Sequence, residues 1–229
     1  MSTPIISVII PAFNEEQSIG KVVTDIPRDL VQNVIVVNNN STDNTVQVAS
    51  DAGAIVLDEP RKGYGWACLK GIEKSKELNT QITVFLDGDY SDYPEEIIDV
   101  VRPILEEDHD MVIGSRVLGK REKGSLTPQQ VFGNWLATRL MRIFYRARFS
   151  DLGPFRAIKA DSLEKLKMSD KTYGWTIEMQ IKAAKHKMKF CEVPVKYRKR
   201  IGVSKVSGTV KGTVLAGIKI IGAIFKYRF

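Results

Sequence analysis

Residues 84–92 read VFLDGDYSD, an apolar run that ends abruptly in aspartates. The run from Ile82 to Leu86 has the length and composition of a buried β-strand, and the apolar residues from Ile97 to Ile104 recur with the spacing of an amphipathic helix. The same succession of short strand and helix repeats along the first 115 residues, with strands predicted at 5–10, 34–37, 54–57 and 111–113. This alternation predicts an α/β fold, a mostly parallel sheet with helices on both faces.

The pattern changes after residue 116. A glycine-rich charged loop, a basic helix over 129–148, a short strand over 155–158, a helix over 175–187 and a strand over 190–197 are expected there. The basic loop RKRIGVSK and a last helix follow. We expect one domain over 1–206 and a C-terminal amphipathic helix over 207–229, which serves as a packing element or as a membrane-surface element.

Composition and charge restrict the class of protein. The chain has 229 residues, of which 43% are hydrophobic, and a net charge of +7, which fits one globular domain. Its two cysteines have no CxxC spacing and predict neither a disulfide framework nor a zinc site. Residues 1–110 carry a balance of −12 and residues 111–229 a balance of +19. The basic half predicts an anionic partner such as a membrane surface or a phosphorylated small molecule.

Two classes of partner or location are disfavoured. Nucleic acid would be repelled by the acidic half, and the sequence contains no groove-reading module. The N-terminus lacks the basic region of a signal peptide, and the terminal helix, with Lys211 and Lys219, is too charged to span a bilayer.

Polar clusters follow three predicted strands, and parallel strands bring such ends to one crevice. Aspartates 87 and 89, with Gly88 between them, favour a divalent metal, Mg²⁺ or Mn²⁺, shared with a diphosphate. An Asp-Gly turn that caps the next helix is the alternative for this pair. The stretch NNNSTDNT over 38–45 is equally typical of helix capping. No GxGxxG follows the first strand and no P-loop occurs, so a dehydrogenase or a P-loop ATPase is disfavoured.

Eight motifs in order carry a family resemblance over nearly the whole chain. They are SVIIPAFNEE, VIVVNNNSTDNT, RKGYGWACLKGI, VFLDGDYSDYPEEI, MVIGSR, FRAIKADSLEKL, WTIEMQIKAA and EVPVKYRKRIGVSK. Together they resemble the GT-A fold glycosyltransferases of family 2, and within them the dolichyl-phosphate mannose or glucose synthase-like group. The resemblance implies a nucleotide-sugar donor, GDP- or UDP-linked, a metal at the DxD motif, inversion at the anomeric carbon and a polyprenyl-phosphate acceptor.

The resemblance also implies roles for individual residues. The implied nucleotide-sugar site consists of Pro11, Phe13, Asn14, Glu15, Asn38, Asn39, Gly63, Asp87, Gly88 and Asp89, with Asp87 and Asp89 as the metal ligands. The implied catalytic residues are Asp87, Asp89, Arg116, Arg200 and Lys205. The implied acceptor site consists of Arg116, Asn134, Arg139, Glu178 and Ser204. The sequence departs from the family pattern where Phe13 stands for tyrosine, Asn38-Asn39 for an aspartate pair, Ser91 for glutamine and Gln129-Gln130 for a basic residue.

The expected function is therefore hexose transfer to a polyprenyl or dolichyl phosphate by a peripheral protein at the cytoplasmic face of a membrane. The aromatic and arginine residues of the basic helix suit the headgroup layer of a bilayer, and a solvated helix face is the alternative. The terminal helix could also mediate a homodimer. Two other functions stay open, transfer to a hydroxyl acceptor with Glu178 as the base, and a non-catalytic nucleotide-binding module.

Overall fold

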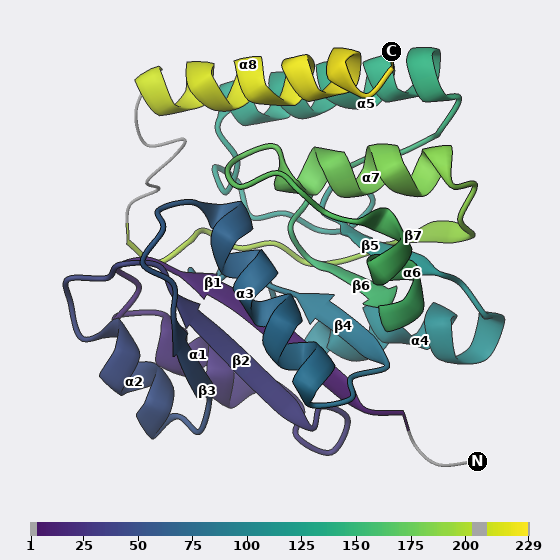
Figure 1. The fold of residues 1–229 in the computed structure, drawn as a ribbon. Helices are drawn as coiled ribbons and strands as arrows, with labels where there is room; N and C mark the ends of the chain where they lie inside the picture. The colour runs from purple at the N-terminus through teal and green to yellow at the C-terminus, as the bar shows by residue number, and fades with distance from the viewer. Residues whose placement is uncertain (1–3, 203–209, 229) are drawn as a thin grey trace.

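The computed structural model describes residues 4–202 and 210–228, and within them a seven-stranded sheet in the order β3-β2-β1-β4-β6-β5-β7 (Figure 1). The strands are β1 (Ile6–Ala12), β2 (Asn33–Asn38), β3 (Ile55–Asp58), β4 (Ile82–Phe85), β5 (Met111–Ser115), β6 (Arg156–Lys159) and β7 (Phe190–Pro194). In this sheet β6 runs antiparallel to both neighbours, while the other pairings are parallel. The predicted mostly parallel α/β fold is confirmed.

Helices cover both faces of the sheet, as predicted. One face carries α1 (Ile19–Asp25), α2 (Thr45–Asp51), the 3₁₀ turn η1 (Pro94–Glu96) and α4 (Ile97–Glu107). The other carries α3 (Tyr64–Glu77), α5 (Pro128–Tyr145), α6 (Ala160–Leu166), α7 (Trp175–Lys185) and α8 (Val210–Lys226).

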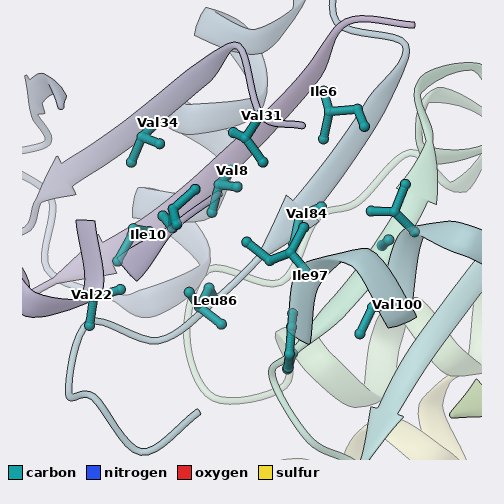
Figure 2. Close-up of a cluster of buried hydrophobic side chains, with 14 of the residues drawn as sticks. Ile6, Val8, Ile10, Val22, Val31, Val34, Val84, Leu86, Ile97 and Val100 are labelled. Carbon is teal, nitrogen blue, oxygen red and sulfur yellow. The ribbon is translucent and has the colours of Figure 1, made fainter. Parts of the chain in front are cut away.

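Strand β1 lies inside the described sheet, between β2 and β4, and contributes to both cores. Its even-numbered residues Ile6, Val8 and Ile10 pack with α1 and α4 (Figure 2), while Ile9 points to the opposite core. All four are fully buried, and each such side chain contributes roughly 1.5–3 kcal/mol of burial free energy. The period of two along β1 thus holds both helical layers on one sheet.

Helix α3 approaches β1 closely because it carries Gly71 at the contact. A Cβ atom on Gly71 would lie 2.4 Å from Cγ2 of Ile9, so a larger residue would push the helix away. The close approach brings the N-terminus of α3 to the carboxyl edge of the sheet.

The described end of α8 packs onto the body of the protein. Ile224 is fully buried in the same core as Met141 of α5, and the rings of Phe144 and Phe225 lie 5.2 Å apart in an edge-on arrangement. Figure 1 shows α8 and α5 forming the outermost helical layer above α7. The predicted boundary at residues 206 and 207 lies outside the described residues.

None of the helices in the described ranges combines the length and apolarity that crossing a bilayer requires.

Candidate functional site

A cavity of about 360 Å³ opens where the ends of β1, β2 and β4 meet the start of α3. Nine residues predicted from the sequence line this cavity: Pro11, Phe13, Glu15, Asn39, Gly63, Asp87, Gly88, Asp89 and Arg200. The lining also includes residues that the sequence analysis did not single out: Ala12, Lys62, Tyr64, Ala67 and Tyr173. The expected convergence of strand ends is confirmed by this geometry.

The two aspartates of the DxD motif occupy the end of β4 and have different partners. Asp87 accepts a hydrogen bond from the Tyr64 hydroxyl at 3.1 Å. Asp89 accepts hydrogen bonds from the backbone N–H and the hydroxyl of Ser91. Burial, and then the charge of Asp89, raise the pKa of Asp87 to about 7. The pair is therefore a concentration of negative charge that a cation would stabilise.

Arg200 is the cation that reaches this pair in the described structure. Its guanidinium lies 3.0 Å from Oδ2 of Asp89 and 2.8 Å from Oε1 of Glu15. Backbone hydrogen bonds hold the segment in place, because Ile201 N–H donates to the Asp89 carbonyl and Arg198 N–H donates to that of Ser91. The basic loop, more than 100 residues away in sequence, is thus attached directly to the DxD motif.

The other predicted members of that loop, Ser204 and Lys205, lie outside the described residues.

Asn39 fastens the loop that leads into α3. Its amide donates to the carbonyls of Glu59 and Arg61, and its carbonyl oxygen accepts from Gly63 N–H at 2.8 Å. Both amide hydrogens are occupied, so Asn39 faces a ligand with acceptor capacity only. The side chain of Asn38 is also engaged within the protein. Its amide N–H donates to the Asp58 carboxylate, and its carbonyl oxygen accepts from Ser41 N–H.

Position 63 requires glycine for two reasons, its backbone conformation and the lack of room for a side chain. Its φ of 147° is one that other residues rarely adopt, and a Cβ atom there would lie 2.2 Å from the Lys171 carbonyl. The loop before α3 is therefore pressed against the segment that carries Tyr173 into the cavity wall.

Asn14 contributes to the site without lining the cavity. It adopts φ 53°, its side-chain oxygen accepts from Thr42 N–H, and its own N–H donates to Ser41. These contacts join the polar ends of β1 and β2.

Four residues expected to bind the acceptor lie outside the cavity lining: Arg116, Asn134, Arg139 and Glu178. Arg116 forms a two-point ion pair with Asp151, with N–O distances of 2.8 and 2.7 Å. Asn134 bridges α5 to the loop after it, through the carbonyl of Ser150 and the N–H of Leu152. The structure gives both side chains a positioning contact within the protein.

Arg139 is exposed on the outside of α5.

Glu178 is fully buried and engaged on all sides. It accepts from the Ser169 and Asp170 N–H groups, the Ser169 and Tyr227 hydroxyls, and Lys182. Burial alone would raise the pKa of Glu178, but these donors outweigh it and lower the pKa below its ordinary value. In this arrangement Glu178 anchors the loop before α7 and does not face the cavity.

Two buried aspartates were not predicted as site residues from the sequence. Asp151 pairs with Arg116, and Asp92, only 2% exposed, has no hydrogen-bond partner for its carboxylate among the described residues. Burial first, and the charges of Asp87 and Asp89 next, raise the pKa of Asp92 well above its usual range. Only Asp92 had a signal in the sequence, since it closes the DGDYSD stretch.

The fold has solved relatives. Glucosyl-3-phosphoglycerate synthase from Mycobacterium tuberculosis, in complex with Mn²⁺, UDP and glucosyl-3-phosphoglycerate, superposes with a TM-score of 0.77 over 98% of this chain and 80% of its own, at 22% identity. At that identity the likeness concerns the fold.

The chain is also similar in sequence to bacterial and archaeal glycosyltransferases. An uncharacterized glycosyltransferase of Mycobacterium tuberculosis is 32% identical over 223 residues, covering 94% of this chain and 96% of its own. The UDP-N-acetylglucosamine–dolichyl-phosphate N-acetylglucosaminyltransferase of Methanococcus voltae is 29% identical, covering 86% of each chain.

The family model described as glycosyl transferase family 2 matches residues 7–167, which include the ends of β1, β2 and β4 that form the cavity. With this match, and with 32% identity to the mycobacterial glycosyltransferase over 94% of its length, the chain belongs to glycosyl transferase family 2.

Proposed function

We propose that this family 2 glycosyltransferase moves a hexose from a GDP- or UDP-linked sugar to a polyprenyl phosphate, with inversion at the anomeric carbon, and works at a membrane surface. The observation that carries the proposal is the placement of Asp87, Asp89 and Arg200 in one cavity with the loops that end β1 and β2. This places carboxylates and a cation together where a nucleotide diphosphate would lie.

The carboxylate pair fits a resident Mg²⁺ or Mn²⁺. Clusters of three or more metal-ligating side chains do not occur among residues 4–202 and 210–228, but Mg²⁺ is commonly held by one or two carboxylates, with phosphates and water completing the shell. Asp87 and Asp89 would hold the ion, which supplies positive charge to the diphosphate leaving group when bound. Structural relatives with Mn²⁺ or Mg²⁺ and UDP support the assignment.

Arg200 has the position to stabilise charge on the leaving group. Its guanidinium already contacts two carboxylates at the cavity, and it can bind phosphate oxygens in the same two-pronged manner. Negative charge grows on the diphosphate as its bond to the anomeric carbon breaks. A cation placed there contributes most in the transition state.

The partners of the carboxylates favour a phosphate acceptor. Three carboxylates line the cavity: Glu15 is bound to Arg200, and Asp87 and Asp89 are assigned to the metal. A hydroxyl acceptor needs a general base within hydrogen-bond reach, whereas a phosphate monoester is already anionic and attacks without one. The dolichyl-phosphate acceptor named for the Methanococcus voltae relative supports the same choice.

The test offers polyprenyl phosphate and polyprenol side by side, in detergent, with UDP- or GDP-hexose and Mn²⁺. We expect a glycosylated polyprenyl phosphate that disappears when the metal is chelated. Transfer to the polyprenol alone would overturn the phosphate acceptor and show that the acceptor is a hydroxyl. Detergent makes the assay independent of membrane docking.

A further inference from the structure

Helix α5 exposes large apolar side chains in the described structure. Phe132, Trp135 and Ile143 are 61%, 56% and 62% exposed. Arg139 and Arg142 are exposed between them. Positions 132, 135, 139 and 143 are three or four residues apart, so they lie along one side of the helix. These five residues are called the outer face of α5.

The opposite side of α5 is fixed by the core. Ala137 and Met141 are fully buried, and the Tyr145 hydroxyl donates to the Ile224 carbonyl of α8 at 2.5 Å. Packing against α7 and α8 therefore sets the rotation of the helix. The outer face is held outward and cannot turn into the protein without losing this core.

The two exposed aromatic rings also contact each other, with centroids 5.9 Å apart. Such a pair forms one apolar wedge on the surface instead of two scattered side chains. Scattered apolar residues are common on protein surfaces, but a contiguous patch indicates an interaction site.

The positive charge around the outer face of α5 indicates which kind of partner binds there. Residues 123–150 contain no Asp or Glu, and the same is true from residue 193 to the end of the chain, which includes α8. No ion pair formed within the described ranges involves Arg139 or Arg142. A second copy would bring its own arginines against these, whereas an anionic bilayer supplies both phosphates and an apolar layer.

We propose that the outer face of α5 is the membrane-docking surface of the protein, on bilayers that contain anionic lipid. Phe132, Trp135 and Ile143 enter the headgroup layer, where aromatic side chains are favoured. Arg139 and Arg142 bind lipid phosphates at the same depth. The inference places docking on α5, whereas the described end of α8 is occupied by packing. It stands separately from the identity of the acceptor.

The experiment measures sedimentation of the full chain with vesicles of phosphatidylcholine, with and without phosphatidylglycerol, without substrates. We expect binding to the anionic vesicles that weakens at high salt, and a blue shift of Trp135 emission that Trp135→Phe removes while binding persists. Phe132→Ser with Trp135→Ser, and Arg139→Glu with Arg142→Glu, should each weaken binding about tenfold or more, as for several lost interfacial contacts.

Matched controls lie on α4, on the other side of the sheet. Ile98 and Leu105 are 45% and 43% exposed, and Arg102 is exposed as well. Ile98→Ser with Leu105→Ser, and Arg102→Glu, should leave vesicle binding unchanged, and circular dichroism checks that every variant is folded.

Three results would overturn the proposal. The wild-type chain could ignore anionic vesicles, or folded α5 variants could bind them as the wild type does. The third is a wild-type dimer in analytical ultracentrifugation that Phe132→Ser with Trp135→Ser converts to monomer, which would make a second copy the occupant.

Discussion

Tyr227, near the end of the chain, donates a 2.7 Å hydrogen bond to the buried carboxylate of Glu178 at the start of α7. The same carboxylate holds the N–H groups of Ser169 and Asp170. The next few residues carry Tyr173 into the cavity wall and press the Lys171 carbonyl against Gly63. The residue after α8 is thereby connected to the cavity wall through the buried carboxylate of Glu178.

We expect Tyr227→Phe to lower the free energy of unfolding by about 1.5–3 kcal/mol, the usual range for a hydrogen bond to a charged group. The ring stays in place and only the donor is lost. Urea unfolding measures the effect, with Tyr173→Phe as the control because that side chain is 39% exposed. Equal stability of Tyr227→Phe and the wild type would contradict a structural role for the bond.

Glu178 should make stability depend on pH in the acid range. Its donors lower its pKa in the folded state, so its contribution is complete above the unfolded pKa of about 4.3 and is lost as the pH falls through the folded value. Glu178→Gln should be less stable at pH 7 and lose less stability on acidification. Thermal melts of both proteins from neutral to acid pH test this, and parallel curves would refute it.

Asp89→Asn should reduce transfer by about a hundredfold or more, the scale of losing one preorganised charge contact. The fold should persist, because the change also relieves the repulsion that raises the pKa of Asp87. Transfer rates with Mn²⁺ and a thermal melt are the measurements. Wild-type turnover would remove Asp89 from the metal site.

Arg200→Ala should lower kcat more than it raises KM for the donor, since leaving-group charge develops in the transition state. Lys205→Ala is expected to behave alike. Lys199→Ala is the matched control, because Lys199 is exposed on the same segment and does not line the cavity. A loss confined to KM would make Arg200 a simple binding residue.

Asn39→Asp should weaken nucleotide-sugar binding about tenfold, although aspartate is the residue that the family pattern favours there. A carboxylate cannot donate to the Glu59 and Arg61 carbonyls, and two lost hydrogen bonds at about 1 kcal/mol each exceed that factor. Titration calorimetry with UDP and GDP provides the measurement, and exposed Asn44→Asp provides the control. Unchanged binding would show that the loop does not depend on this amide.

The local hydrophobic pattern of the sequence determined the fold class and the strand-end residues that line the cavity. Short apolar strands alternating with amphipathic helices predict a parallel sheet, and a parallel sheet places its carboxyl ends together, which is why Asp87, Asp89, Glu15 and Asn39 were foreseeable as neighbours. The strand predictions fell within a few residues of the observed bounds because the apolar period is a local property of the chain.

Tertiary structure alone decided which polar side chains were free to act. Sequence gives residue types but not their partners, and a buried charge takes whatever partner the fold brings near. In the folded protein Arg116 forms an ion pair with Asp151. The carboxylate of Glu178 accepts hydrogen bonds from four residues: Ser169, Asp170, Lys182 and Tyr227. It also turned α5 so that Phe132 and Trp135 face outward, because the core selected the opposite side of the helix.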